Sequence, residues 1–358
     1  MPHPKLHILL LASRFGMPYR VLRCARAGGA KIFVLGSAAA NGLHRSRFCT
    51  QFQLAATPID GARSEALAAE INQITQRFGI DVVLAGDAPA TRSLIASADL
   101  LLARSFPMPG LADFDLLNNK WTFTQLCQSL GVQCPKTWLF AKASELVKFL
   151  AADEERGTFI AKPLSMDSSK GVVTLRSSTV AGQAAKLTYR PIVLQEFIEG
   201  QDIGASVFCR NGQVEQFIAH HYARGTYAPF TDPRIKSDLQ AVLGSLKTTG
   251  IFNFDMRRTT DGRVFYLECN PRVFWKISMS MMAGVNFITA GLEMLGLAAM
   301  RPAPERLKTV LFPKALLLQT ATAPWQLRAA SAQMLEFLCA DPVPYYREIL
   351  GLERDPAD

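Results

Sequence analysis

Residues 251–272 read IFNFDMRRTTDGRVFYLECNPR, and this pattern predicts a β-hairpin. Apolar, β-favouring residues run up to Asp255 and again from Val264 to Leu267. Between the two runs, the dipeptide Asp261-Gly262 is typical of a two-residue hairpin loop. We therefore expect two antiparallel strands joined at this dipeptide.

The predicted hairpin gathers oxygen-bearing side chains on one face. With a two-residue loop, Thr260 pairs with Arg263. Continuing the pairing outward places Asp255 opposite Glu268, with Cβ atoms roughly 5 Å apart. Asn270 returns to the same face because strand side chains alternate. Two carboxylates that close share a proton or hold a hard cation such as Mg²⁺, which usually also binds substrate phosphates. The alternative is a plain hairpin with solvated carboxylates.

A guanidinium follows this cluster directly. The segment Asn270-Pro271-Arg272 places Arg272 just beyond the predicted metal, and arginine is the preferred partner of planar anions such as carboxylate or phosphate. Together with Asn253-Phe254-Asp255 and Glu268-Cys269, it resembles the metal-binding end of the ATP-grasp superfamily.

The composition is that of a globular protein. The chain has 358 residues, 49% apolar and 19% charged, which suffices for two or three substructures. Lys and Arg exceed Asp and Glu, 39 against 30, without a block of like charge, so small anionic substrates are favoured over a specific nucleic-acid partner. Seven scattered cysteines indicate reduced thiols, and no apolar run approaches the ~18 residues of a membrane span. We expect a soluble, cytoplasmic protein with no membrane partner.

The N-terminal residues alternate between strand and helix. Residues 5–36 have a strand-helix-strand pattern, 64–78 form an amphipathic helix capped by Ser64, and 81–85 form another strand. Such alternation predicts a small parallel sheet. The loop at 12–16 lies at a carboxyl end of that sheet, where ligands tend to bind, but it lacks the Gly-x-Gly-x-x-Gly fingerprint of a dinucleotide site.

A lysine lies at the start of the next predicted helix. Residues 98–118 have the weak pattern of a linker, and a helix then runs from Lys120 to Leu130, capped by Asn118 or Asn119. A cation in the first turn is unfavourable beside the positive end of the helix dipole unless an anion lies nearby. The alternative for Lys120 is an ordinary exposed lysine.

A second lysine ends a strand and precedes a polar loop. Residues 158–163 form a short strand containing Lys162, residues 164–171 are small and polar, and another strand follows. Such a loop offers backbone donors to phosphates, but it lacks the P-loop pattern, and a plain hairpin tip is the alternative. Residues 192–202 predict a buried strand that turns at Gly200 and offers backbone groups to a heterocycle edge.

The remaining segments carry weaker signals. Residues 220–234 predict a long loop, in which the adjacent His220 and His221 would point opposite ways and are not expected to share a metal. The Met-rich helix after residue 276 is typical of adaptable core. Residues 301–358 are proline-rich, with one helix near 327–338, and form a tail of unknown role.

The order of these segments extends the resemblance to the ATP-grasp superfamily over roughly residues 110–297, in the manner of a carbamoyl-phosphate-synthase-like ATP-binding domain. The implied fold class is α/β, an ATP-grasp fold preceded by a small Rossmann-like parallel-sheet domain. The implied domains are 1–110 for the Rossmann-like domain, 111–300 for the ATP-grasp domain and 301–358 for the tail. The ATP-grasp domain divides into 111–194, with a lid loop at 164–171, and 195–300, with the metal site.

The resemblance also implies a role for each matching residue, around an ATP and Mg²⁺ site with Mn²⁺ as an alternative ion. Arg272 and Lys162 are the implied catalytic residues, with Arg272 facing the acceptor carboxylate or the transferring phosphoryl group. The implied metal ligands are Asp255, Glu268 and Asn270, and the implied nucleotide contacts are Lys120, Lys162, Ser168, Ser169, Lys170, the hinge residues Gln195, Glu196, Phe197 and Ile198, and the ribose acid Asp202.

These roles imply an ATP-dependent carboxylate–amine ligase. A substrate carboxylate attacks the γ-phosphate to give an acylphosphate, and an amine, less often a thiol, then displaces phosphate. The implied partners are a small-molecule carboxylate and amine, with a homodimer as one option. The chain departs from the family pattern at Glu196, where many relatives carry lysine, and at Trp275-Lys276, which replaces a glycine-containing stretch and is expected to reshape the acceptor pocket.

Three other functions stay open. An ATP-dependent carboxylase would form carboxyphosphate within the same fold, although no biotin-carrier segment is visible. An ATP-binding regulatory protein would keep the fold without turnover. A basic nucleic-acid binder would need a basic run or an aromatic–basic alternation, which the sequence lacks.

Overall fold

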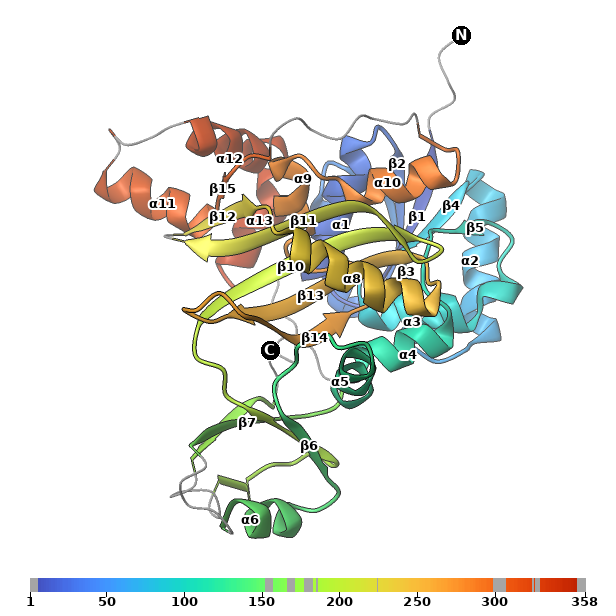
Figure 1. Ribbon diagram of the computed structural model, residues 1–358. Coiled ribbons are helices and arrows are strands. Elements are labelled where there is room, and N and C mark those ends of the chain that lie inside the picture. Colours follow the sequence, from blue (N-terminus) through green and yellow to red (C-terminus); the bar gives the residue numbers. More distant parts are fainter. Residues whose placement is uncertain are drawn as a thin grey trace.

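The computed structural model describes most of the chain in three sheets and their flanking helices (Figure 1). Residues 166–170 of the predicted lid loop 164–171, which include Ser168, Ser169 and Lys170, lie outside the described residues. The described residues are 6–151, 157–165, 171–176, 183–184, 186–223, 225–298, 307–323, 325 and 329–352. Among them, no helix combines the length and apolarity needed to cross a bilayer.

The N-terminal sheet is parallel, with strand order β3-β2-β1-β4-β5, as the alternating pattern predicted. Its central strand β1 is an apolar run buried on both faces, which is typical of parallel sheets covered by helices. The elements are β1 His7–Ala12, α1 Gly16–Ala27, β2 Lys31–Gly36, the 3₁₀ helix η1 Ala38–Arg45, β3 Cys49–Leu54, α2 Glu65–Phe78, β4 Val82–Ala85, α3 Ala88–Ala96, the 3₁₀ helix η2 Ala98–Leu100 and β5 Arg104–Ser105.

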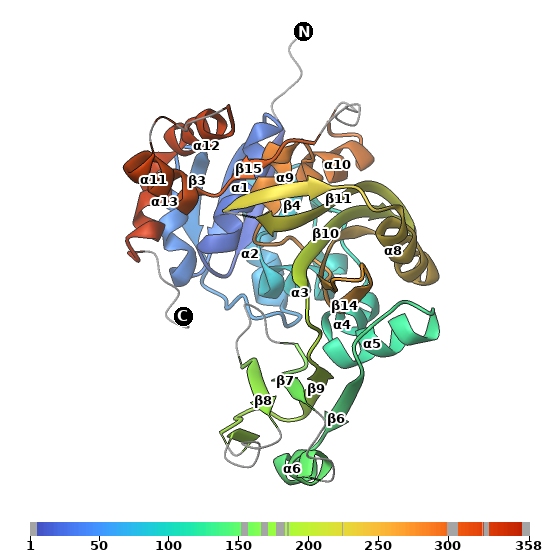
Figure 2. The ribbon, with the colours of Figure 1, turned by 60° about the vertical axis from the view of Figure 1, so that its left-hand side comes forward.

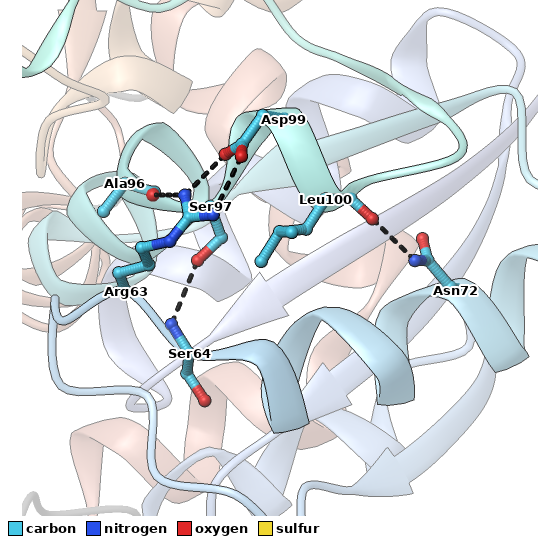
Figure 3. A network of polar contacts seen from close by, with 7 residues as sticks. All are labelled: Arg63, Ser64, Asn72, Ala96, Ser97, Asp99 and Leu100. Atoms are coloured by element: carbon cyan, nitrogen blue, oxygen red, sulfur yellow. Dashed lines mark hydrogen bonds and ion pairs between the residues drawn. The ribbon is translucent and has the colours of Figure 1, made fainter.

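A polar network fixes α2 against α3 and η2 (Figure 3). The Arg63 guanidinium donates to both carboxylate oxygens of Asp99, at 2.5 and 2.8 Å, just before α2 begins. The Ser64 backbone N–H donates to Ser97 Oγ at 3.2 Å, and Asn72 Nδ2 donates to a carbonyl of η2 at 2.7 Å. Both members of the Arg63–Asp99 pair are solvated, so we assign the network a positioning role and little stabilising energy.

The second sheet is small and antiparallel, with order β6-β9-β7-β8, and forms the lower lobe of the molecule in Figures 1 and 2. Apolar side chains such as Leu146, Leu150 and Phe159 pack α6 onto it as a separate core. The elements are β6 Thr137–Phe140, α6 Ala143–Ala151, β7 Thr158–Lys162, β8 Val173–Arg176 and β9 Ile192–Glu196.

The third sheet has order β14-β13-β10-β11-β12-β15 and is antiparallel. Helices α5 and α8 contribute to its core, where Phe123 and Leu239 pack near Phe252 and Phe254. The elements are α4 Leu111–Asn118, α5 Lys120–Ser129, β10 Gln201–Arg210, β11 Gln213–Ala223, β12 Thr226–Phe230, α8 Pro233–Leu246, β13 Gly250–Arg258 and β14 Val264–Asn270.

The C-terminal helices join the N-terminal sheet in one apolar core. Leu316, Met334 and Tyr345 belong to the same cluster as Ile8 and Leu22, so the described part of 301–358 packs as an integral layer (Figure 2). Tyr19 Oη donates to the Asp341 carbonyl at 2.9 Å across this contact. The elements are α9 Ile277–Ala283, α10 Phe287–Met294, β15 Val310–Leu311, α11 Pro313–Thr322, α12 Ala329–Ala340 and α13 Pro342–Ile349.

Two segments differ from the sequence prediction. The predicted linker 98–118 contains α4, which the pattern missed because its apolar residues do not follow one clear helical stripe. The predicted loop 220–234 is wrong, because β11 continues to Ala223 and β12 pairs back onto it. His220 is buried in β11 and stacks on Tyr227 with ring centroids 4.2 Å apart, while His221 contacts Phe230, so the two rings point opposite ways as expected.

We expect Gly291→Ala to lower the free energy of unfolding by about 1–3 kcal/mol, the usual range for overpacking a core. A Cβ atom at Gly291 of α10 would lie 2.1 Å from Cζ of the buried Phe106, which follows β5. Urea denaturation measures the effect. The double variant with Phe106→Leu should recover part of the loss, and purely additive losses would contradict the contact.

Candidate active site

The two strands of the hairpin bring the predicted acidic residues together. In the ladder of β13 and β14, Asp255 pairs with Glu268 and Asn253 pairs with Asn270. The Asn270 amide nitrogen lies 3.3 Å from Asp255 Oδ2, so Asn270 shares the face of the two carboxylates.

The turn, however, differs from the predicted two-residue loop. The Thr259 N–H donates to the Arg263 carbonyl at 2.9 Å, so the loop contains three residues and Thr260 does not pair with Arg263. The Gly262 N–H donates to the Thr259 carbonyl at 3.0 Å, and Gly262 has φ +84°. This left-handed glycine after a tight turn is typical of three-residue hairpin loops.

An irregularity in β14 restores the predicted pairing of Asp255 with Glu268. The register shifts between Asp255 and Met256, because Met256 pairs with Tyr266 and leaves Leu267 as an extra residue. Such a bulge reverses which face the following side chains occupy. It therefore lets Tyr266 point into the core while Glu268 points into a cleft.

Lysines surround the two carboxylates. Lys120 Nζ lies 3.2 Å from Glu268 Oε2, and the Lys120 side chain is only 6% exposed. Asn119 caps α5 through its side chain, which sets Lys120 in the first turn, and the Lys120 N–H donates to the Leu164 carbonyl at 2.9 Å. The anion that this buried cation needs beside a helix N-terminus is thus Glu268. The exposed-lysine alternative is wrong.

The charges shift one another's pKa values in different directions. Burial and the nearby Glu268 charge raise the pKa of Asp255 to about 6. Burial would raise the pKa of Glu268 as well, but Lys120 and Lys162 outweigh it and lower that pKa. Burial and the charge of Lys120 lower the pKa of Lys162 to about 8. The lysines thus stabilise the charge of Glu268, whereas the charged form of Asp255 is destabilised by burial and by Glu268.

This donor set fits a hard cation held by few protein ligands. Asp255 and Glu268 supply carboxylate oxygens, and a bound cation would remove their repulsion. No cluster of three His, Cys, Asp or Glu side chains suited to a metal occurs in the described part of the chain. The third ligand would have to be Asn270, whose Oδ1 accepts from Arg272 Nη2 at 2.9 Å in this structure.

Arg272 lies away from the cleft. Its side chain is buried, and besides Asn270 it donates to the Val273 carbonyl at 3.1 Å. The structure therefore shows Arg272 orienting the Asn270 amide, and its direct contact with substrate stays a prediction.

The carboxylates line a cavity of about 510 Å³ between the second and third sheets. This volume suits a drug-sized or nucleotide-sized ligand. The predicted hinge side chains and the predicted phosphate lysines meet around this one space. Among the residues that line it are Lys120, Lys162, Gln195, Glu196, Phe197, Ile198, Asp202, Asp255, Glu268 and Lys276.

Two residues of the cavity wall have no role in the sequence interpretation. Arg257 Nε lies 2.9 Å from Asp202 Oδ1, its Nη1 donates to the Ile198 carbonyl at 2.9 Å, and its guanidinium stacks over Phe197 at 4.8 Å. It is two residues from Asp255 on β13, so strand alternation could have identified it. Lys276, which also lines the cavity, was noted only as a departure from the family pattern.

The comparisons with known proteins agree with this geometry. The profile of the family described as ATP-grasp in the biosynthetic pathway with Ter operon matches residues 188–311. The match includes Asp202, Asp255, Glu268, Asn270 and Arg272, and excludes Lys120 and Lys162. No curated protein sequence shows significant similarity to the chain.

Solved structures share the fold at low sequence identity. N5-carboxyaminoimidazole synthetase from Staphylococcus aureus with ADP has TM-score 0.66 and 15% identity, over 86% of this chain and 82% of that one. The L-amino acid ligase from Bacillus licheniformis has TM-score 0.59 and 17% identity, over 81% and 74%. The biotin carboxylase domain of Hydrogenobacter thermophilus 2-oxoglutarate carboxylase has TM-score 0.63 and 14% identity, over 86% and 73%. The resemblance is confirmed: the chain has the ATP-grasp fold, preceded by a Rossmann-like parallel-sheet region.

We expect Asp255→Asn to stabilise the free protein near pH 7.5, on the order of 1 kcal/mol. The folded pKa of Asp255 lies above its usual value of 3.8, so its favourable contribution is present below about pH 4 and lost as pH rises through about 6. Asparagine cannot ionise, so the gain in Tm should fade as the pH is lowered to about 4.

The matched control is Asp261→Asn in the exposed hairpin loop, where Thr259 and Arg263 lower the pKa of the carboxyl. This variant should not be stabilised at either pH. Equal Tm values for Asp255→Asn and the unmodified protein at both pH values would show that the two carboxylates do not repel each other.

Proposed function

We propose that this protein is an ATP-dependent, Mg²⁺-dependent ligase that joins a small-molecule carboxylate to an amine and releases ADP and phosphate. The observation that carries the proposal is the convergence of two carboxylates and two buried lysines at one cavity large enough for a nucleotide. The named neighbours act as an ADP-binding synthetase, an amino acid ligase and a carboxylase domain, which supports ATP-dependent ligation as the class of reaction.

In this proposal, the nucleotide base lies along residues 195–198 at the end of β9. The buried Gln195 offers an amide nitrogen that has no hydrogen-bond partner within the described ranges. Buried polar groups are usually paired, so this donor suits the edge of a heterocycle. Asp202, held by Arg257, would accept from the ribose hydroxyls, with Glu196, Phe197 and Ile198 as the remaining hinge contacts.

The triphosphate would extend toward Lys120 and Lys162. Both lysines are buried at the cavity and are therefore poorly hydrated. Phosphate oxygens would give their ammonium groups the hydrogen bonds and the negative charge that water does not supply there. Ser168, Ser169 and Lys170 of the proposed lid loop 164–171 would cover the phosphates, and Leu164 already ties the start of that loop to α5. The lowered pKa of Lys162, about 8, makes an anionic partner especially favourable for its charged form.

Asp255, Glu268 and Asn270 would hold Mg²⁺, or Mn²⁺ in its place, which when bound neutralises phosphate charge. The amide of Asn270 would have to release Arg272 to present its oxygen. Arg272 would then be available for the acceptor carboxylate or the transferring phosphoryl group. Arg272 and Lys162 are accordingly the proposed catalytic residues.

The reaction needs positioning and charge neutralisation rather than a nucleophilic side chain. A carboxylate oxygen of the substrate attacks the γ-phosphorus, and the bond to the β-phosphate oxygen breaks to release ADP. The amine then attacks the acyl carbon, loses a proton and displaces phosphate. Glu268, paired with Lys120, stays ionised throughout, because the two lysines hold its pKa below the usual range.

The proposed domains follow the sheets: a Rossmann-like domain at 1–110, an ATP-grasp domain at 111–300 and the C-terminal helices beyond. We propose a cytoplasmic protein acting on small molecules, with a homodimer as one option. The second candidate function is an ATP-dependent carboxylase, because two of the three neighbours described above carry carboxylation in their names. A regulatory protein without turnover is the third.

One screen separates these functions. Phosphate release from ATP is measured over a grid of carboxylates and amines, with bicarbonate as one acceptor and mass spectrometry of the products. Release that requires both a carboxylate and an amine supports the ligase. Release with bicarbonate alone supports the carboxylase, and ATP binding without release over the whole grid contradicts both enzymes.

We expect Glu268→Gln to abolish Mg²⁺-dependent turnover while the protein stays folded, because the neutral amide weakens the hold on a hard cation and leaves Lys120 unmatched. The loss should exceed about a hundredfold in kcat. The control Glu215→Gln removes an exposed carboxylate that pairs with Arg210 at 2.8 Å on the third sheet, and it should leave the rate unchanged. An unchanged rate in Glu268→Gln would remove this residue from the metal site.

A further inference from the structure

A second cavity, of about 390 Å³, lies beside the first. Its walls come from the start of α1, from the residues that follow the hairpin and from the C-terminal helices α11, α12 and α13. Figure 2 shows these helices on the side of the molecule where α1 lies. The cavity therefore requires a part of the chain for which the sequence suggested no function.

Aromatic side chains dominate this cavity. Five of them line it and come from five separate segments, so no local sequence pattern could have revealed the cluster. Flat aromatic walls favour a flat aromatic ligand, because rings gain energy from stacked and edge contacts beyond the burial of area. The five are Tyr19, Trp275, Phe312, Phe337 and Tyr345.

Cations lie over two of these rings. Arg20 is centred 3.7 Å above the Trp275 ring and donates to both Glu348 oxygens, at 3.0 and 3.3 Å. Arg23 is buried, lies 3.5 Å from the Phe337 ring and donates to Tyr19 Oη at 3.0 Å. Arg20 is therefore committed to an internal carboxylate, whereas the described residues place no carboxylate within 4 Å of Arg23.

Trp275 is held in place as part of the wall. Its indole packs against the first turn of α1, where a Cβ atom on Gly16 would lie 2.8 Å from Trp275 Cζ3. Arg20 also donates to the Gly16 carbonyl at 2.7 Å, so the backbone, the guanidinium and the indole form one stack. Trp275 is nevertheless 51% exposed, a large fraction for an aromatic residue that the protein has fixed in position.

Lys276 connects the two cavities. It lines the 510 Å³ cavity with Asp255 and Glu268, and it lines the aromatic cavity with Trp275. A substrate in the aromatic cavity would therefore present its polar end at Lys276, on the side of the proposed phosphates. The lining of the aromatic cavity carries four cations, Arg20, Arg23, Lys276 and Lys314, against the single acid Glu348 among the described residues.

We propose that the aromatic cavity binds the acceptor substrate, and that this substrate is a carboxylic acid with a planar aromatic body, its carboxylate at Lys276 and its ring against Trp275. The proposal rests on the ligase function proposed above and specifies its substrate class. It also assigns the C-terminal helices a function, because Phe337 and Tyr345 complete the aromatic wall.

The test is calorimetric titration of the full chain, without nucleotide, with three probes of similar size: phenylpropionate, cyclohexylpropionate and phenylpropionamide. Phenylpropionate should bind at least about threefold more tightly than its saturated-ring analogue, because of ring stacking. It should bind at least about tenfold more tightly than the neutral amide, because of the charge at Lys276. Equal affinity for the three probes, or no binding of phenylpropionate, would overturn the assignment.

Matched variants locate the binding. Trp275→Leu should remove the preference for the aromatic ring, and Lys276→Gln should remove the preference for the acid over the amide. Trp325→Leu changes a tryptophan that is 79% exposed outside the cavity, and Lys308→Gln removes an exposed lysine, so both controls should keep both preferences. Preferences that survive in Trp275→Leu and Lys276→Gln would place the ligand elsewhere and refute the proposal.

One further measurement distinguishes failure of the ligase proposal from failure of the aromatic-acid proposal. Phosphate release with ATP, Mg²⁺, an amine and either phenylpropionate or an aliphatic acid is measured on the same preparation. Turnover of the aliphatic acid without binding of phenylpropionate contradicts the aromatic class and keeps the ligase. Selective binding of phenylpropionate, lost in Trp275→Leu, supports the cavity even where no phosphate is released, and the absence of release then counts against the ligase.

Discussion

The structure depends on holding two carboxylates side by side at the end of a cleft. Asp255 and Glu268 face each other across β13 and β14, and burial strengthens their repulsion because water is excluded. Lys120 and Lys162 compensate one of the two charges and leave the other with a pKa near 6. In the proposed function, a bound cation and phosphates would remove this repulsion, and its cost in the free protein would be recovered as affinity for them.

The two lysines and the two carboxylates come from three segments that are distant in the sequence. Lys120 stands at the start of α5, Lys162 at the end of β7, and the two carboxylates on the hairpin. The cap by Asn119 and the bond from the Lys120 N–H to the Leu164 carbonyl fix α5 to the strand that carries Lys162. Glu268, 3.2 Å from Lys120, offsets part of the cost of burying that cation, so the charge arrangement supports the fold that creates it.

The sequence predicted that Asp255 and Glu268 pair, but not the loop and the bulge that produce this pairing. Alternation of strands and helices was enough for the parallel sheet. The pairing of Asp255 with Glu268 was predicted correctly, but from a two-residue loop that the protein does not have. The loop length was wrong, and the extra residue Leu267 in β14 compensated the error. Bulges depend on which side chains the core accepts, here Tyr266 against α8, and no local pattern encodes that. Lys276 was missed for a similar reason, since its position on the cleft wall is defined by contacts across elements, whereas strand alternation from Asp255 could have identified Arg257.

The positions of the C-terminal helices are even less predictable from local sequence patterns. Tyr345 and Phe337 reach the cavity only because Arg20 pairs with Glu348 and Tyr19 bonds the Asp341 carbonyl, over sequence separations above 300 residues. These contacts join the end of the chain to α1, whose first turn already supports Trp275 through the bare backbone of Gly16. Trp275, which follows the hairpin, is therefore held by α1, and α1 is itself tied to the C-terminal helices. Any shift of the C-terminal helices moves the wall next to Lys276, and with it the side of the cleft where the proposed acceptor would meet the nucleotide.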